Sequence, residues 1–220
     1  MAVIINIETS SKVCSVALSK DGVIEFELED STGMKHAECL APFVEKCVAE
    51  AKRKDYAIDA VAVSLGPGSY TGLRIGLSLA KGLAFSLGVP LIGLSTLKIL
   101  SVKAMFRNML WEGDEIIMGM VDARRMEVFA GGYDFSLKEV VKEGPEILTE
   151  DSFSQLYPYR KVIFIGDGSE KFKELYKGDN AVWLGNLYPH ARDMIALSEK
   201  CFRENDFIDT AYSTPNNLKE

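Results

Sequence analysis

Residues 60–97 decide the fold of this chain, and they read AVAVSLGPGSYTGLRIGLSLAKGLAFSLGVPLIGLSTL. The first six residues form a short apolar run rich in Val, which is typical of a buried strand. The Gly-Pro-Gly sequence at 66–68 then interrupts regular structure. Thr71 is placed to cap a helix, and Gly88 is the usual signal that ends one. The stretch predicts a strand, a glycine loop, a helix and a second, parallel strand over 90–94.

The predicted helix opens at Gly72 and carries small residues at every fourth position. These residues are Gly72, Gly76, Ala80 and Ala84. A glycine inside a helix costs about 1 kcal/mol relative to Ala, so Gly76 and Gly82 indicate close backbone contacts. Leu and Ile occupy most of the remaining circumference, and a helix this apolar is normally covered on more than one side. We expect the sheet on one side and a helix of this chain or of a partner on another.

The glycine loop invites a nucleotide-binding interpretation. A Walker loop needs Gly, four residues and then Gly-Lys-Ser/Thr, and the spacing here differs, with no Lys after the glycines. Amides at the helix N-terminus could still hold an anion, with Arg74 nearby. We favour the simpler interpretation, in which the loop is a tight turn that holds the strand against the helix.

The same stretch resembles a known family. GPGSYTGLRIG at 66–76, AKGLA at 80–84 and PLIGLSTL at 90–97 resemble the bacterial TsaB (YeaZ) family, which is similar to the catalytic TsaD proteins once called glycoproteases. The resemblance covers the chain well up to about Tyr133 and the remainder only loosely.

The order of predicted elements along the chain is repeated. The first half reads as three strands, the amphipathic helix His36–Arg53, and then strand, helix and strand; the second half repeats this order more faintly. Short helices are expected over 150–156 and 169–176, and a connecting helix over 98–113. This pattern predicts an α/β fold of the actin, sugar-kinase and Hsp70 type (ASKHA, ribonuclease H-like), with duplicated domains around a cleft; the TsaB resemblance implies the same fold.

The duplication suggests where the domains begin and end. We expect an N-terminal domain over 1–100, completed by a C-terminal helix over 191–204. A smaller domain would occupy 101–190, and residues 205–220 would form a tail. This tail lacks the Pro-x-Tyr-Leu-Arg-like ending usual in the family.

Composition narrows the possible partners. The chain has 25 Lys and Arg against 32 Asp and Glu, a net charge of −7. Because phosphate contacts dominate affinity for nucleic acids, such a chain is a poor stand-alone tRNA binder. No apolar run is long enough to cross a membrane, and the N-terminus lacks the basic region of a signal peptide. We therefore expect a cytoplasmic protein.

Three turns are candidates for nucleotide binding. In ATP-using members of this architecture, the hairpin turns hold phosphates with Asp, Gly and Ser/Thr. Here the first turn, 8–12, has Glu8 and no glycine, and the second, 122–126, has neither glycine nor hydroxyl. The candidate residues are Thr9, Ser10, Lys12, Gly166 and Gly168. We expect no cofactor, with ATP or ADP and Mg²⁺ in the cleft or at a subunit interface as the alternative.

Metal and nucleophile patterns are incomplete. TsaD relatives carry His-x-x-x-His on the helix that corresponds to 36–53, which places both imidazoles on one face. Here the second position is Leu40, so we expect no metal and interpret His36 as a residue that caps or packs the helix start. There is no HExxH or Gly-x-Ser-x-Gly motif, and no catalytic residue is expected.

The resemblance to TsaB implies a function. It implies a non-catalytic subunit required for threonylcarbamoyladenosine formation beside the tRNA anticodon, which pairs with TsaD, or with itself as a homodimer, and works with TsaE. Contact with tRNA would come only through the complex. The alternatives are an ATP-dependent phosphotransferase or ATPase of the same fold and, less favoured, an M22-type peptidase. The expected partner-binding residues are His36, Leu40, Phe43, Cys47, Tyr70, Gly72, Arg74, Ile75, Gly76 and Leu79.

Overall fold

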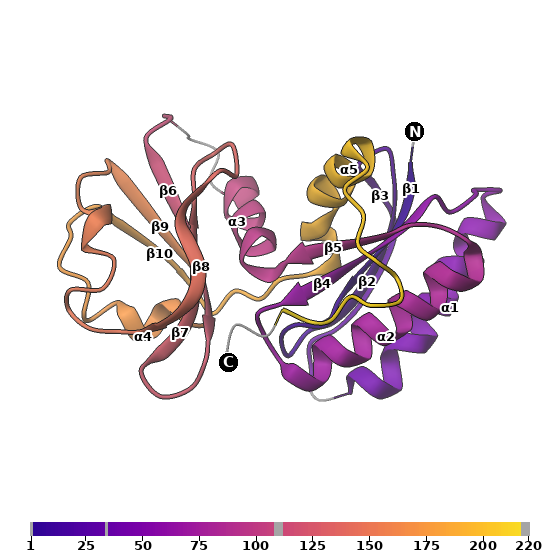
Figure 1. The fold of residues 1–220 in the computed structure, drawn as a ribbon, viewed down its shortest axis with the longest axis horizontal. Coiled ribbons are helices and arrows are strands. Elements are labelled where there is room, and N and C mark those ends of the chain that lie inside the picture. The colour runs from indigo at the N-terminus through magenta and orange to yellow at the C-terminus, as the bar shows by residue number, and fades with distance from the viewer. Residues whose placement is uncertain (1, 34, 108–111, 217–220) are drawn as a thin grey trace. The chain divides into compact units, whose positions relative to one another are not determined.

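The computed structural model describes residues 2–33, 35–107 and 112–216. It contains two compact units, one formed by residues 2–99 with 189–216 and the other by Leu100–Tyr188. Each unit is built on one five-stranded sheet (Figure 1), and the strand orders β3-β2-β1-β4-β5 and β8-β7-β6-β9-β10 correspond. The predicted duplicated α/β fold is confirmed.

The first sheet is mixed. Its strands are β1 (Val3–Glu8), β2 (Cys14–Lys20), β3 (Val23–Asp30), β4 (Ala60–Gly66) and β5 (Leu91–Ser95). The first three strands form the predicted antiparallel meander, and β4 and β5 run parallel to β1. The meander is closed by a tight turn in which Asp21 and Gly22 adopt positive φ.

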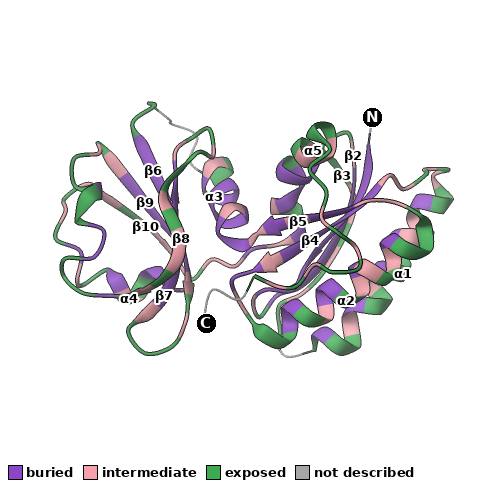
Figure 2. Cartoon of the chain, in the orientation of Figure 1, coloured by how far each residue is buried: buried purple, intermediate pink, exposed green. Residues whose placement is uncertain are grey.

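Helices cover both faces of this sheet. On one face, α1 (His36–Arg53) packs against Val16 and Leu18 of β2, and α2 (Tyr70–Leu87) packs against Val61 and Val63 of β4. Because neighbouring side chains of a strand point to opposite faces, Ala17 faces the other side. There it packs against Ala191 of the 3-10 helix η2 (Ala191–Met194) and Ile195 of α5 (Ile195–Glu204). Figure 2 shows the buried strands between helices whose outer turns are exposed.

The ends and the glycines of α2 can be compared with the prediction from the sequence. The helix ends at Gly88 in the left-handed conformation, as predicted. Its N-cap is Ser69 rather than Thr71, and the helix begins two residues earlier than expected. Gly76 packs closely against Thr9, as predicted, whereas Gly82 is exposed with open space beside it, so the prediction of a close contact there is wrong.

Among the residues that the structure describes, the helices between the strands of the second unit are shorter than α1 and α2. Its strands are β6 (Glu115–Asp122), β7 (Glu127–Tyr133), β8 (Glu139–Ile147), β9 (Lys161–Gly166) and β10 (Ala181–Gly185). Only the 3-10 turn η1 (Ser154–Leu156) forms within 150–156, and α4 (Ser169–Phe172) stops short of Tyr176. The connecting helix α3 (Thr96–Arg107) starts two residues before the predicted position. The part of its predicted range at 108–111 lies outside the described residues.

Residues 205–216 lie along the first sheet. Ile208 forms an antiparallel bridge with Leu91 of β5, and the amide of Asn216 donates to the carbonyl of Leu65 at 2.7 Å. The end of the predicted tail, 217–220, lies outside the described residues. None of the helices in the described ranges has the length and hydropathy needed to span a membrane.

Candidate functional site

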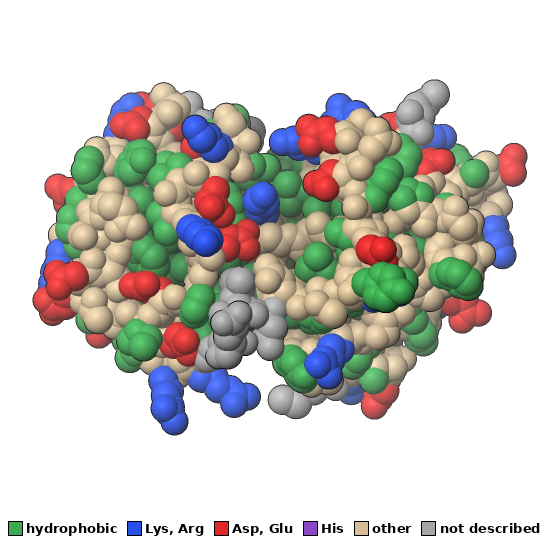
Figure 3. All heavy atoms as spheres, in the orientation of Figure 1, with side chains coloured by type: hydrophobic (Ala, Val, Ile, Leu, Met, Phe, Trp, Pro, Cys, Tyr) green, Lys and Arg blue, Asp and Glu red, His purple; other side chains and the backbone are tan. Residues whose placement is uncertain are grey.

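The α1–α2 face of the first unit is the main candidate for an interaction site. A groove of about 520 Å³ runs between the two helices. It is lined by His36, Ala37, Leu40, Ala41, Arg74, Ile75, Ser78 and Leu79. Tyr70 and Phe85 of α2 are 54% and 85% exposed, which is unusual for large apolar side chains. Figure 3 shows the mixture of apolar and charged side chains on one face of the molecule.

The expected partner-binding residues divide by exposure. Tyr70 and Arg74 are exposed, and the Arg74 guanidinium lies 4.0 Å from the centre of the Tyr70 ring, in the range of a cation–π contact. Phe43, Ile75 and Leu79 are half-buried. These five side chains are available at the surface of the unit.

The other expected partner-binding residues are buried in the unit. These are His36, Leu40, Cys47, Gly72 and Gly76. Leu40 and Cys47 belong to the core against β1 and β2, and their contact with a partner stays a prediction. Leu40 and His36 still line the grooves on this face. Exposed Phe85 was not among the predicted residues, although its position near the end of an apolar helix was a signal.

The two glycines of α2 are explained by the turn after β1. A Cβ at Gly72 would overlap the carbonyl oxygen of Thr9, and one at Gly76 would overlap the Thr9 hydroxyl. A hydrogen bond holds the preceding loop against the same turn: the amide of Ser69 donates to the carbonyl of Ser10 at 2.6 Å. The loop therefore packs strand and helix together, which is the simpler of the two interpretations.

The first candidate phosphate-binding turn, 8–12, is buried at Glu8, Thr9 and Ser10. Glu8, Thr9 and Ser10 are at most 2% exposed. The amide of Ser10 donates to one Glu8 carboxylate oxygen at 2.6 Å, and the other oxygen has no partner among the described residues. Burial raises the pKa of the Glu8 carboxyl, opposed by hydrogen bonds from Ser10 and Ser64. Lys12, by contrast, is exposed.

The second and third turns meet in the second unit. The amide of Asp122 donates to the Asp167 carboxylate at 3.0 Å, and Lys171 lies 2.7 Å from the Asp122 carboxylate. Burial raises the pKa of the Asp167 carboxyl, opposed by the hydrogen bond from the Asp122 amide. Gly166 and Gly168 have a local reason to be glycine, since a Cβ at either would press on the backbone of β6. Close packing on β6 is therefore enough to explain glycine at both positions, without a bound nucleotide.

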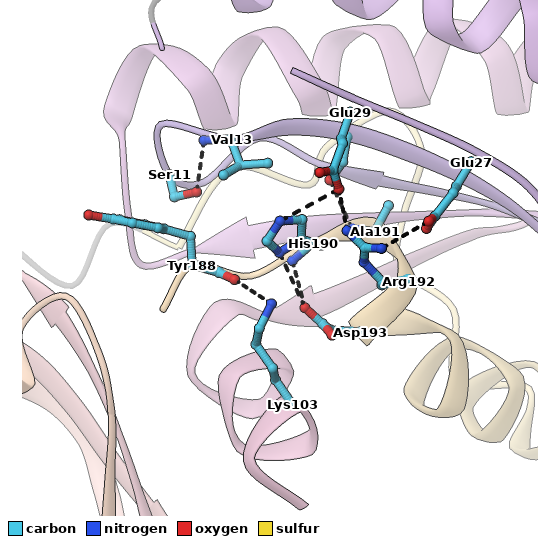
Figure 4. Close-up of polar contacts among 11 residues, drawn as sticks. Ser11, Val13, Glu27, Glu29, Lys103, Tyr188, His190, Ala191, Arg192 and Asp193 are labelled. Atoms are coloured by element: carbon cyan, nitrogen blue, oxygen red, sulfur yellow. Dashed lines mark hydrogen bonds and ion pairs between the residues drawn. The ribbon is translucent and has the colours of Figure 1, made fainter. Parts of the chain in front are cut away.

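A polar cluster holds the segment before α5 against the meander (Figure 4). Arg192 pairs with Glu27 at 2.9 Å and also with Glu29. His190 lies 3.6 Å from carboxylate oxygens of both Glu29 and Asp193. Sequence reasoning missed this cluster. The spacing of Glu27 and Glu29 along β3 was the signal, because period-two spacing places both on one face; Glu25 instead pairs with Lys54, directly after α1.

Histidine and acidic side chains do not gather into a metal site in the described ranges, where no group of three potential ligands occurs. His36 is buried at the start of α1, and the N-cap position belongs to Lys35, which makes no side-chain cap. His36 therefore packs the helix start and does not cap it. At the second position of the TsaD pattern, Leu40 fills the core.

The fold is a duplicated α/β fold of the sugar-kinase type. The structure of a polyphosphate/ATP-glucomannokinase from Arthrobacter shares this fold, with a TM-score of 0.50 and 14% identity over 92% of this chain and all of that one. YeaZ from Pseudomonas aeruginosa is much more similar, with a TM-score of 0.81 and 25% identity over 99% of this chain and all of that one.

Sequence comparisons narrow the class to one family. The family model described as "TsaD: tRNA N6-adenosine threonylcarbamoyltransferase" matches residues 30–217. The tRNA threonylcarbamoyladenosine biosynthesis protein TsaB of Escherichia coli (strain K12) is 30% identical, over 96% of this chain and 92% of its own length. TsaB of Buchnera aphidicola subsp. Schizaphis graminum is 32% identical, over 92% and 94%. The chain belongs to the TsaB (YeaZ) family, within the wider TsaD group.

Proposed function

We propose that this chain is a non-catalytic subunit in the formation of threonylcarbamoyladenosine in tRNA. In this role it binds a catalytic TsaD subunit through the α1–α2 face and works with TsaE. Membership of the TsaB family supports the pathway, since the relatives are named as biosynthesis proteins for this modified nucleoside. We expect the chain to be located in the cytoplasm, where the complex would meet tRNA.

One observation carries the non-catalytic part of this proposal: Leu40 at the position of the second histidine. It is 1% exposed and packed among Val and Leu side chains of the sheet and α1. The Leu40 side chain has no atom that can bind a metal ion. Moving it aside to admit another ligand would leave a cavity in the core, which costs stability. The pair of imidazoles implied for TsaD is therefore replaced here by part of the core.

The exposed part of the α1–α2 face supports the binding role. Tyr70, Arg74 and Phe85 are of the residue types that are enriched at protein interfaces, and they lie on one helix with half-buried Ile75 and Leu79 beside them. TsaD is similar to this chain in the same helices, so a TsaD pair of helices and a second copy of this chain would compete for one surface. With a net charge of −7, the chain contacts tRNA only within the complex.

We propose further that the turns at 8–12 and 166–169 hold no nucleotide in the isolated chain. Glu8, Thr9 and Ser10 are packed under α2, where a triphosphate would have to displace them. Calorimetry with ATP and Mg²⁺ separates this role from an ATPase or phosphotransferase. Micromolar binding accompanied by turnover would contradict the proposal.

A depletion experiment tests the function. Extract from cells that lack this chain should lose tRNA threonylcarbamoylation, and the purified chain should restore it. A stoichiometric subunit restores activity in proportion to the amount added, until it equals the amount of TsaD. Full restoration by a small fraction of that amount would show a separate enzyme, and no restoration would place the chain outside the pathway.

A further inference from the structure

Two cysteine side chains meet where α1 packs on β2. Cys14 is the first residue of β2 and is 2% exposed. Cys39 lies at the start of α1 and is half-buried. The two thiols are in hydrogen-bond contact, and both side chains belong to the same apolar cluster. The contact therefore joins a strand and a helix that are separated in the chain by β3.

The packing of α1 along β2 independently places these two thiols together. Cys14, Val16 and Leu18 belong to one cluster on one face of β2, since side chains two residues apart share a face. Further along, Cys47 of α1 contacts the backbone of Leu18. The rise from Cys39 to Cys47 is about 12 Å along a helix, and the rise from Cys14 to Leu18 is about 13 Å along a strand. The matching spacings bring Cys39 over Cys14.

The thiol pair lies apart from the groove between α1 and α2. Successive residues of a helix are turned by about 100°, so Cys39 and Ala41 lie on opposite sides of the buried Leu40. Ala41 lines the groove, and Cys39 is not among its lining residues. On its own side, Cys39 faces the end of the sheet where Cys14 pairs with Asp30 of β3. The two thiols therefore form a site distinct from the proposed partner-binding groove.

The two thiols differ in reactivity. Burial raises the pKa of the Cys14 thiol, and the contact with Cys39 adds to this effect. Because the thiolate is the nucleophile, Cys14 stays protonated and does not react first with an oxidant. Cys39 is the more accessible of the two. Direct contact then allows Cys14 to react with an oxidised Cys39 next to it.

We propose that Cys14 and Cys39 form a reversible disulfide when the chain is exposed to a peroxide. The Cys39 sulfur attacks hydrogen peroxide, the O–O bond breaks, and Cys39 becomes a sulfenic acid while one oxygen leaves as water. The Cys14 sulfur then attacks the Cys39 sulfur and loses its proton, and the hydroxyl group of the sulfenic acid leaves with that proton as a second water. The thiols together lose two electrons and two protons, which reduce the peroxide. Disulfides of cytosolic proteins are usually transient bonds of this redox-sensing kind.

Peptide mapping of the whole chain tests the bond. The chain is treated with hydrogen peroxide, unfolded, alkylated with N-ethylmaleimide and digested with trypsin, which places the four cysteines on separate peptides, 13–20, 36–46, 47–52 and 201–203. We expect 13–20 linked to 36–46, with the link lost after dithiothreitol, while 47–52 and 201–203 are alkylated. A sulfinic or sulfonic acid at Cys39 without this link, an unreacted Cys39, or equal amounts of other links would overturn the proposal.

A matched pair of variants tests the assignment. Cys39→Ala should abolish the link and leave 13–20 alkylated. Cys201→Ala, which removes another half-buried thiol, should form as much of the link as the parent chain. Equal amounts of disulfide in the two variants would refute the site.

Hydrogen exchange of the oxidised parent chain shows whether the bond forms in the folded state. We expect the amides of β1 to keep their protection, because the two thiols already meet in the native packing. Loss of that protection on oxidation would contradict the proposal. All of these measurements use the isolated chain, so their failure would leave the proposed binding of TsaD unaffected.

Discussion

The two units of this chain have sheets with the same strand order, and they differ in the segments that cover these sheets. Between β3 and β4, and between β4 and β5, the first unit has α1 and α2, each of 18 residues. At the corresponding places the second unit has a 3-10 turn of three residues and a helix of four. The duplication therefore preserves the strand order, while the helices differ between the copies.

The second unit compensates with aromatic side chains. Phe153, Phe164, Phe172, Tyr176 and Trp183 form one cluster against its sheet. The rings of Phe164 and Trp183 stack at 4.4 Å, and Phe153 meets Phe172 edge to face at 5.5 Å. Since aromatic residues bury large areas each, short segments can cover a sheet face that otherwise requires a helix.

This difference bears on function. A long helix packs on its sheet with one face and exposes the opposite face, which is available to other proteins. The aromatic side chains of a short segment are buried on their own sheet and expose little surface. In the second unit, α3 packs on the sheet through Leu100 and Ala104 and leaves Phe106 exposed, but it has 12 residues. Among the described residues, the two helices of 18 residues, with Tyr70 and Phe85 exposed on α2, belong to the first unit. The proposed partner contacts therefore fall there.

The largest effect is expected from the aromatic cluster. Phe172 is fully buried, and Phe172→Ala should lower the stability of the second unit by about 3–5 kcal/mol. Hydrogen exchange measures this for each sheet, and protection should fall in β9 while it persists in β1. Phe135→Ala, at a position 53% exposed, is the control. Equal loss of protection in both sheets would show that the units do not fold as the comparison implies.

A smaller effect is expected at the glycines of α2. Gly76→Ala places a methyl group on the Thr9 hydroxyl and should cost about 1–3 kcal/mol by overpacking. Gly82→Ala, where the space is open, should instead stabilise the chain by about 0.5–1 kcal/mol. Denaturant unfolding of the two variants checks this. Shifts of the same sign would mean that the packing of Gly76 on Thr9 does not limit this helix.

The buried carboxyl of Glu8 predicts a pH dependence. Burial raises its pKa in the folded chain above the ordinary value of 4.5, so folding favours the protonated form. Its contribution to stability is full below pH 4.5 and is lost as the pH rises through the raised pKa. Glu8→Gln removes this loss and should stabilise the chain at pH 7 by less than about 2 kcal/mol.

Urea unfolding as a function of pH measures the effect at Glu8. The difference between Glu8→Gln and the parent chain should shrink as the pH falls below 4.5. Glu50→Gln is the control of opposite sign, because hydrogen bonding to Arg53 lowers the pKa of Glu50. A gap between Glu8→Gln and the parent that stays constant with pH would contradict this account.

The sequence predicted the strands well and the short segments poorly. Periodicity over many residues defined α1 at both ends, and the strand order followed from the repeat. The cap of α2 was missed because Ser69 and Thr71 both offer hydroxyls two residues apart, and the backbone decides between them. The helix expected over 150–156 is too short for periodicity to distinguish it from an aromatic segment that packs through its side chains.

The candidate site was predicted as a region and not residue by residue. The apolar stripe that located α1 and α2 is the stripe that packs inward, so Leu40 and Cys47 belong to the core. The exposed residues of the same helices lie off that stripe, and Phe85 was missed for this reason. The cluster of His190, Arg192 and the β3 glutamates joins segments 160 residues apart or more, which no local pattern reports.

The central claim is that the chain acts by binding TsaD through the exposed part of α2. Its most direct test is the affinity of TsaD for the purified chain and for the double variant Tyr70→Ala with Arg74→Ala, with Phe135→Ala in the second unit as control. We expect the parent and the control to bind alike and the double variant at least about tenfold more weakly, the loss typical of interface hot spots, while its unfolding is unchanged. Equal binding by the double variant, or a loss confined to Phe135→Ala, would contradict the account.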